Sequence, residues 1–355
     1  MNNFEALKNN IIPSDVLVKL LDTYKMIGSN ELISQTLDEE EAFLVEKNIE
    51  NITYTLSRRL KLKVNENRLR LLIIKNSSPL NLEEKKVKGI KEVIANIIKD
   101  AENNTFNGSD ILQYLNHIFG KNSHKFTNRI YNELLAHDYD LKKTSIRLIL
   151  ENMIDEYHVH ITKKDYEAIY LSLIVYLFMD LMRPYTDHNE LAGELALYYM
   201  LIRIGIKPLK YVDFFALIDE VRPKWEQEMQ LCYINFPKSP LQLNNFIPIL
   251  LSIINKAYNE ITIKIKDKNQ EKRMFKRDGI EQTIYMLPNT FTKEDIRKYH
   301  PMVSESTLNR TLFALRDKGI IMPLGKGRSA RWIKLLDEND PRNIFGGNYE
   351  SNDQE

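Results

Sequence analysis

The chain of 355 residues carries 43% hydrophobic and 28% charged residues and a formal net charge of +1. This composition is ordinary for a globular protein, and the length suggests two or three domains. The single cysteine, Cys232, excludes a disulfide framework and a cysteine-based zinc site within the chain. The sequence has no apolar run of transmembrane length and no basic-then-apolar leader, so we expect a cytoplasmic protein with no membrane partner.

Residues 1–100 are predicted to form an N-terminal helical region. Apolar residues recur at helical spacing in VLVKLLDTYKMI from Val16 and in GIKEVIANIIKD from Gly89. Residues 37–60 form another amphipathic helix between them, and Asn81 has the position of a helix cap. These patterns predict a mainly α fold.

Two apolar helices on either side of a polar loop are the central feature of the sequence. Residues 165–182 are so apolar that we predict a helix buried on all sides, and a second apolar helix begins at Leu191. Polar groups between two buried helices are costly to keep without a purpose. Because the first N–H groups of a helix are unpaired and favour anions, the loop at 183–190 is the predicted functional site.

This loop resembles a degenerate copy of the Fic-domain motif, H-P-F-x-D/E-G-N-G-R-x-x-R. The positions that fit the motif are Pro184, Tyr185, Asp187 and Asn189. The positions that depart from it are Arg183 in place of the histidine, His188 and Glu190 in place of the two glycines, and Leu191 and Glu194 in place of the two arginines. The replaced residues are those that carry the chemistry of the motif, whereas the retained residues mostly determine the shape of the loop.

The resemblance covers roughly residues 35–260 and implies a Fic-like helical bundle at 101–260, preceded by the N-terminal helices. In that family the motif histidine is the general base that frees a target hydroxyl, and the acidic residue, Asp187 here, holds Mg²⁺. The glycines cradle the α- and β-phosphates of ATP, and the arginines hold the outer phosphates. Arg183 stands at the position of the base, and a guanidinium stays protonated in proteins, so it cannot accept the proton.

The helix predicted at 37–60 is similar to the inhibitory helix that precedes many Fic domains. Glu50 and Asn51 match the last two positions of its motif, S/T-x-x-x-E-G/N, whereas Glu46 stands at the first. In the family this glutamate pairs with the motif arginine, which would make Glu50 a regulatory residue. Since Leu191 and Glu194 replace the arginines, the alternative is that Glu50 is an exposed helix carboxylate.

Three interpretations of the loop stay open. The first is a non-catalytic sensor or scaffold that requires no cofactor. The second is a diverged transferase acting on a protein hydroxyl, with ATP and Mg²⁺ or another phosphate-containing substrate. There His188 would be the base, Asp187 the metal ligand and Asn189 a phosphate ligand; the alternative for His188 is a loop histidine with a structural hydrogen bond. In the third, Arg183 pairs with Glu50 or Glu194 and locks the N-terminal helix.

The cavity at the loop discriminates between the first two interpretations. A transferase needs Asp187 and His188 to face one cavity that can hold a nucleotide. In a scaffold, the side chains of Arg183, Tyr185 or Glu194 can fill that cavity.

Residues 278–336 resemble a winged-helix domain, a small α+β fold, after a charged linker at 261–277. DGIEQTIYML predicts a first helix, and Thr292 with Asp295 forms a capping box for a second. A third helix begins at Ser304 or Ser306 and stops at Gly319, and a two-stranded ribbon around residues 325–328 follows. The acidic tail at 337–355 is predicted to be disordered.

Basic charge supports DNA as the partner of this C-terminal domain. Residues 271–336 contain 14 Lys or Arg and 7 Asp or Glu, whereas the whole chain has a surplus of only +1. The predicted DNA-binding residues are Ser306, Thr307, Asn309 and Arg310 on the third helix and Lys326, Arg328 and Arg331 on the wing. The alternative is a winged helix that mediates only protein contacts. A homodimer and a protein target are further candidate partners, and no metal site is predicted because the histidines are scattered.

Overall fold

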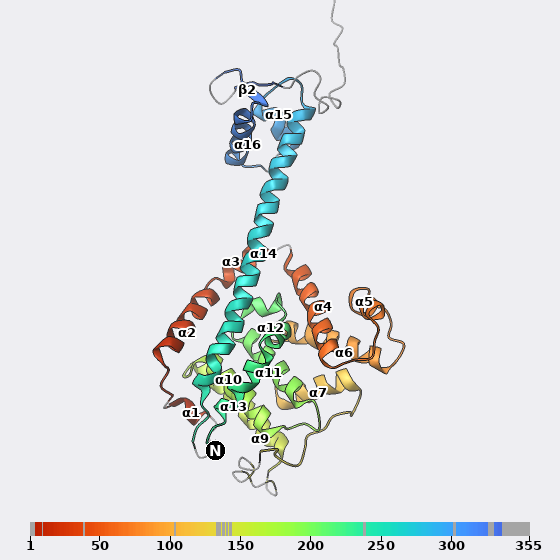
Figure 1. Ribbon diagram of the computed structural model, residues 1–355, viewed down its shortest axis with the longest axis vertical. Helices are drawn as coiled ribbons and strands as arrows, with labels where there is room; N and C mark the ends of the chain where they lie inside the picture. The colour runs from red at the N-terminus through yellow and green to blue at the C-terminus, as the bar shows by residue number, and fades with distance from the viewer. Residues whose placement is uncertain are drawn as a thin grey trace, which may run out of the picture. The chain divides into compact units, whose positions relative to one another are not determined.

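The computed structural model describes residues 4–335, except 9, 38–39, 103, 133–135, 137–138, 140, 142–143, 237–238, 301–302 and 326–329. Side chains at 5–6 and 266–278 are also outside the description. The chain divides into two compact units, residues 1–263 and 264–355. Helices dominate the fold, so the predicted mainly α class is confirmed (Figure 1). No described helix is both long and apolar enough to cross a membrane.

The first half of the N-terminal unit is a series of helices. They are α1 (Glu5–Lys8), α2 (Ser14–Ile27), α3 (Asn30–Leu37), α4 (Glu41–Arg59), α5 (Glu66–Ile74), α6 (Leu82–Asp100) and α7 (Gly108–Phe119). Asparagine side chains cap the N-termini of α5, α6 and α7, at Asn65, Asn81 and Asn107. Local capping chemistry therefore fixes where these helices begin.

The second half of the unit contains its core. Its elements are α9 (Ile146–Lys163), α10 (Ala168–Met182), α11 (Asn189–Arg203), the 3₁₀ helix η2 (Lys207–Lys210), α12 (Phe214–Glu220), α13 (Arg222–Cys232) and α14 (Leu243–Met286). Residues 169–182 of α10 are buried apart from Asp180, and residues 191–202 of α11 are buried as well. The two apolar helices predicted around the polar loop thus pack against each other at the centre of the unit.

The C-terminal unit combines the end of α14 with two short helices and a small sheet. Its elements are β1 (Thr290–Phe291), α15 (Lys293–Tyr299), α16 (Glu305–Asp317), β2 (Ile321–Pro323) and β3 (Trp332–Lys334). The strands are antiparallel in the order β1-β3-β2. Its core includes Ile280, Ile284, Phe291, Ile296, Leu308, Leu312, Leu315, Ile321 and Trp332. This is the predicted small α+β fold.

The sheet of this unit has one strand more than the predicted ribbon. β1 pairs with β3, with Thr290 opposite Ile333 and Phe291 opposite Trp332. The ribbon prediction was therefore incomplete, because a strand of two residues has no periodic pattern in the sequence. The predicted capping box of Thr292 and Asp295 is present, and Gly319 follows α16 with a positive φ of 71°.

Helices α6 and α7 approach closely where α6 has a glycine. A Cβ placed on Gly89 would lie 2.8 Å from the carbonyl oxygen of His117 and 2.9 Å from the Cα of Ile118. Both atoms belong to the backbone of α7, so neither can rotate away. The absence of a side chain at residue 89 is what permits this contact.

Gly89→Ala is expected to lower the free energy of unfolding. Overpacking against a backbone costs about 1–3 kcal/mol, which exceeds the gain of about 1 kcal/mol from replacing glycine in a helix. Urea unfolding followed by circular dichroism measures the change. Gly28→Ala is the control, because a Cβ there meets nothing nearer than 3.3 Å. Equal stability of the Gly89 variant and the wild type would contradict this account of the contact.

Candidate functional site

The polar loop between α10 and α11, residues 183–190, is called the motif loop here. Arg183 ends α10 and His188 precedes α11, and both have left-handed backbones, with φ of 46° and 53°. One left-handed residue at each end of the loop turns the chain sharply. The loop therefore returns the chain from one buried helix directly into the next.

Asn189 and Tyr185 hold the shape of the motif loop. The Asn189 side chain accepts a hydrogen bond from the Tyr185 N–H at 2.9 Å and donates one to the Tyr185 carbonyl at 2.7 Å. The Tyr185 ring is buried, and its hydroxyl donates to the Gly108 carbonyl at 2.8 Å. Asn189, predicted to contact a phosphate, thus has both ends of its amide engaged with the backbone.

The chain segment at 125–132 lies alongside the motif loop. Phe126 and Tyr185 form an antiparallel β-bridge, and the Thr127 N–H donates to the Pro184 carbonyl at 2.8 Å. The Thr186 N–H returns a hydrogen bond to the Lys125 carbonyl at 3.0 Å. The segment therefore forms one wall beside the loop.

His188 is paired with a second histidine that the sequence analysis did not single out. Its Nδ1 lies 2.9 Å from Nε2 of His124, and its ring stacks on Phe119 with centroids 3.9 Å apart. Nδ1 of His124 is in turn 2.8 Å from the Ser123 hydroxyl. Burial lowers the pKa of both imidazoles, and the neighbouring carboxylate of Asp187 opposes this.

Arg183 and Asp187 point to the open side of the loop. The Arg183 guanidinium lies over the Tyr131 ring, 4.1 Å from its centroid. The Asp187 side chain is 75% exposed, and one of its oxygens accepts a hydrogen bond from the His188 N–H at 2.7 Å. The predicted pairing of Arg183 with Glu50 or Glu194 is wrong, because both carboxylates have other partners.

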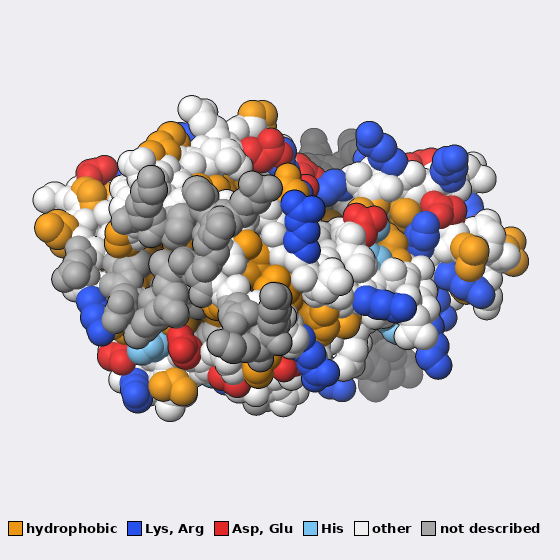
Figure 2. Space-filling model, turned by 90° about the horizontal axis from the view of Figure 1, so that it is seen from below, with side chains coloured by type: hydrophobic (Ala, Val, Ile, Leu, Met, Phe, Trp, Pro, Cys, Tyr) orange, Lys and Arg blue, Asp and Glu red, His pale blue; other side chains and the backbone are white. Residues whose placement is uncertain are grey.

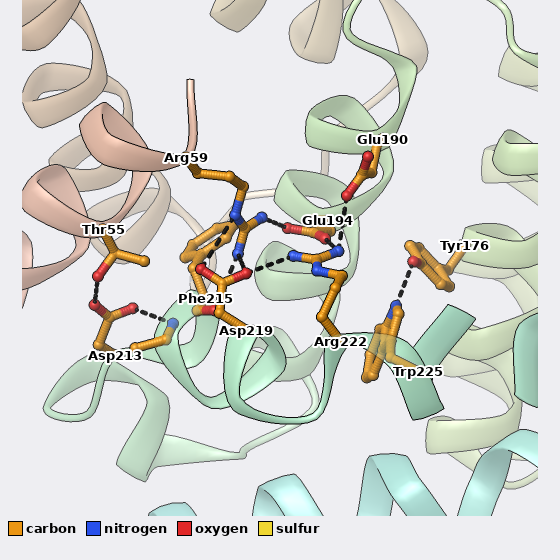
Figure 3. Close-up of polar contacts among 11 residues, drawn as sticks. Thr55, Arg59, Tyr176, Glu190, Glu194, Asp213, Phe215, Asp219, Arg222 and Trp225 are labelled. Atoms are coloured by element: carbon orange, nitrogen blue, oxygen red, sulfur yellow. Dashed lines mark hydrogen bonds and ion pairs between the residues drawn. The ribbon is translucent and has the colours of Figure 1, made fainter. Parts of the chain in front are cut away.

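Glu194 is fully buried and lies between two arginines that reach it from other helices (Figure 3). Nη1 of Arg222, on α13, is 2.6 Å from one carboxylate oxygen, and Nη1 of Arg59, on α4, contacts the other. Asp219 pairs with both arginines, at 2.8 Å from Arg59 and 2.9 Å from Arg222. Glu190 completes this Glu194 network with a 2.7 Å contact to Arg222.

The Glu194 network changes the prediction for the N-terminal helix. Glu50 is 7% exposed and pairs with Lys47 at 2.9 Å, so it is not the exposed carboxylate of the alternative interpretation. Arg59, nearer the C-terminal end of α4, pairs with Glu194 of α11 instead. Arg59 was missed because its partner is 135 residues away in the sequence.

An open cleft of about 1050 Å³ adjoins the motif loop. Asp187 and His188 both line it. A transferase needs these two side chains to face one cavity, and they do. Tyr185 also lines the cleft, but its hydroxyl is turned to Gly108, and the cleft is not filled by it. Within the described residues, no group of three or more His, Cys, Asp or Glu is placed to hold a metal ion.

Five of the seven predicted DNA-binding residues are described, four of them on α16 and Arg331 directly before β3. Ser306 and Arg310 are exposed, whereas Thr307 and Asn309 are half-buried. The Thr307 hydroxyl lies 2.9 Å from the hydroxyl of the helix cap Ser304. Arg331 is exposed, and Lys326 and Arg328 lie outside the described residues.

Glu194→Gln is expected to lower the free energy of unfolding by about 3 kcal/mol, because breaking a buried ion pair leaves charge without compensation. Asp219→Asn is the matched control, since Asp219 contacts the same two arginines from a side chain that is 38% exposed. The control should lose less than about 1 kcal/mol. Chemical denaturation of both variants measures the difference. Similar losses in the two would mean that burial of Glu194 is not what makes it important.

Lowering the pH from about 7.5 to 5.5 is expected to destabilise the fold through the His124–His188 pair. Both folded-state pKa values lie below those of free imidazole, ~6.5, so the unfolded chain binds protons first. The stability is therefore present above the unfolded pKa and is lost as the pH falls through the folded pKa. Unfolding free energies at several pH values measure the slope.

His188→Asn should reduce this slope, since asparagine tolerates the left-handed backbone and does not titrate. His117→Asn, on the exposed side of α7, should retain it. Identical slopes in all three proteins would exclude the histidine pair as the cause.

Comparison with known proteins addresses the fold of the chain. No family model and no curated protein matches the sequence. A Fic family protein from Desulfovibrio desulfuricans G20 has a similar structure, with a TM-score of 0.51, 13% identity and coverage of 92% of this chain and 97% of its own. A Fic domain containing signaling protein from Bacteroides thetaiotaomicron VPI-5482 gives a TM-score of 0.51, 16% identity and coverage of 70% and 96%. The chain therefore has the fold of Fic proteins.

Proposed function

We propose that this chain is a Fic-fold protein whose motif site does not transfer nucleotides and whose C-terminal unit is a winged-helix domain that binds DNA. The protein would act as a DNA-binding regulator or scaffold. It would require no cofactor for this role.

The proposal that the motif site does not transfer nucleotides depends on the arginines beside the motif loop, which are already paired with carboxylates. ATP brings several negative charges, and a transferase must meet them with cations that are free to bind phosphate. Arg222 lines the cleft, but it already pairs with Glu190, Glu194 and Asp219. A fully buried carboxylate thus stands where the family motif has an arginine, and it takes up the neighbouring positive charge.

The motif loop also lacks the two glycines that would let the phosphates of ATP approach its backbone. His188, directly before α11, occupies a left-handed position that favours glycine, and its ring stacks on Phe119, the last residue of α7. Glu190 adds a side chain and a negative charge at the second glycine position. Asp187 alone remains as a candidate metal ligand. We therefore derive no reaction step through Mg²⁺ or ATP.

A diverged transferase is the second candidate function, and the open cleft favours it. Asp187 and His188 line the same cavity, which is large enough for a nucleotide. His124 orients the His188 ring through Nδ1, as a second residue orients a general base in many enzymes. In this reading His188 would take the proton of a protein hydroxyl.

The arrangement of the C-terminal unit supports DNA as its partner. The order of α15, α16, β2 and β3 is that of a helix–turn–helix followed by a wing. The N-terminal half of α16 presents Ser306 and Arg310 to solvent. Its one carboxylate, Glu305, is paired with Lys293 and Arg297 of α15, so it opposes a phosphate backbone less than a free carboxylate would.

The test measures DNA binding and label transfer with the full chain. Gel shift with random duplex DNA should show binding that weakens with rising salt, and Arg310→Gln should weaken it about threefold or more, since a charged DNA contact is worth on the order of 1 kcal/mol. Incubation with α-³²P-ATP and Mg²⁺ or Mn²⁺ should label neither the protein nor a lysate.

Asp187→Ala is the control for the transfer assay and Arg316→Gln for the DNA assay, because Arg316 stacks on Phe313 in the last turn of α16. Label that appears in the wild type and disappears in Asp187→Ala would establish the diverged transferase instead. Absence of DNA binding by the wild type would refute the winged-helix assignment of function.

A further inference from the structure

A second concentration of positive charge lies in the N-terminal unit, far along the sequence from the C-terminal unit. Residues 58–91 contain 11 Lys or Arg and only 3 Asp or Glu, in a chain whose net charge is +1. The local surplus is larger than that of residues 271–336.

The fold brings these residues together around a small helical hairpin. Leu69, Leu72 and Ile73 of α5 pack with Val87 of α6 in a separate hydrophobic cluster. The connection at 75–81 is held against both helices by polar contacts, including a hydrogen bond of 2.7 Å from the Leu80 N–H to the Glu84 carboxylate of α6. The Arg68 guanidinium donates to the Ser78 carbonyl at 2.6 Å, and the Ser77 N–H donates to the Leu71 carbonyl at 3.2 Å. The end of α4, α5, this connection and the start of α6 therefore form one ordered surface.

Several cations of this surface have no carboxylate partner. The carboxylates available locally, Glu66, Glu83 and Glu84, are paired with Arg58, Lys86 and Arg68. The exposed cations that form no ion pair of 4 Å or less with any described residue are Lys61, Lys63, Arg70, Lys75 and Lys85, of which Lys63 interacts with Glu83 at longer range. Figure 2 shows Lys and Arg side chains gathered on the right of the view, the side of α5 and α6 in Figure 1. The surface therefore has a positive field that the protein does not neutralise.

Large aliphatic side chains are exposed among these cations. Leu80 is 79% exposed and Leu82 is 73% exposed, and both belong to the connection and the first turn of α6. Leu71 and Ile74 on α5 are 45% and 42% exposed. Single exposed aliphatic side chains are common in proteins, but three leucines and an isoleucine beside five cations without an ion pair form a mixed basic and apolar surface.

We propose that this surface, called the α5–α6 surface, binds the anionic face of a lipid bilayer reversibly. Lysines and arginines near a membrane are attracted by acidic headgroups. Leucines placed among them can enter the boundary between headgroups and acyl chains. One partner thus accounts for both kinds of side chain.

The exposed leucines distinguish a bilayer from a nucleic acid as the partner. A phosphate backbone attracts the five cations equally well, but it offers nothing to Leu80 and Leu82. A folded protein partner would need a pocket of matching shape, whereas a bilayer adapts to a protruding connection. This proposal departs from the expectation that the chain has no membrane partner, and it stands independently of the function proposed above.

Cosedimentation of the full chain with vesicles tests the proposal. The chain should bind vesicles of phosphatidylcholine with one third phosphatidylglycerol, and not vesicles of phosphatidylcholine alone. Binding should weaken as salt rises. Lys75→Gln with Lys85→Gln should weaken it by more than tenfold, since each basic side chain contributes on the order of fivefold. Leu80→Asn with Leu82→Asn should weaken it at every salt concentration.

Matched substitutions on other surfaces are the controls. Leu32→Asn on α3 removes a leucine that is 66% exposed, and Lys224→Gln on α13 removes an exposed lysine. Both should bind vesicles as the wild type does, and so should Arg310→Gln, which alters only the C-terminal unit. Circular dichroism confirms that each variant is folded.

Two results would overturn the proposal. One is equal sedimentation with neutral and anionic vesicles, or none with either. The other is an Lys75 and Lys85 double variant that loses DNA affinity in the gel shift while its vesicle binding is unchanged. That second result would assign the α5–α6 surface to a nucleic acid. Loss of vesicle binding with unchanged DNA binding supports the bilayer and leaves the proposed DNA-binding function intact.

Discussion

The buried carboxylate of Glu194 is the constraint on which the candidate site depends. A charge with no exposure to solvent is stable only if opposite charges and hydrogen bonds compensate it. Arg59 and Arg222 provide this compensation from two other helices, so α4, α11 and α13 are fixed to one another at this point. The position of the N-terminal helix and the electrostatics of the cleft wall follow from the same contact.

The sequence predicted the elements of the site better than their contacts. The two apolar helices, the polar loop and the capping residues Asn81 and Thr292 could be predicted because each is a local pattern. The Glu194 network could not, because its partners lie 135 and 28 residues away and arginine gives no local signal of its partner. His124 was missed for the same reason: its contact with His188 spans 64 residues. The small strand β1 was missed because two residues show no period.

The ion pair between α4 and α11 has the opposite polarity to the one that the resemblance implied. The resemblance implied a glutamate on the first helix and an arginine on the second. Here the charges are exchanged, with Arg59 on α4 and Glu194 on α11. Glu50 remains on the same helix, but Lys47 satisfies it within one turn. The two helices are thus still joined by an ion pair, but the carboxylate is on α11 and the arginine is on α4.

This exchange also decides whether the contact can act as a switch. An ion pair that regulates a protein must break at a small cost in free energy. This requires that both charged groups become solvated when they separate. Glu194 has no route to water in the folded unit, and separation would leave it uncompensated at a cost of about 3–5 kcal/mol. That is a large part of the stability of a typical domain. The Glu194 network therefore favours a structural role, in which Arg59 and Arg222 fix α4 and α13 to α11, over a readily broken switch.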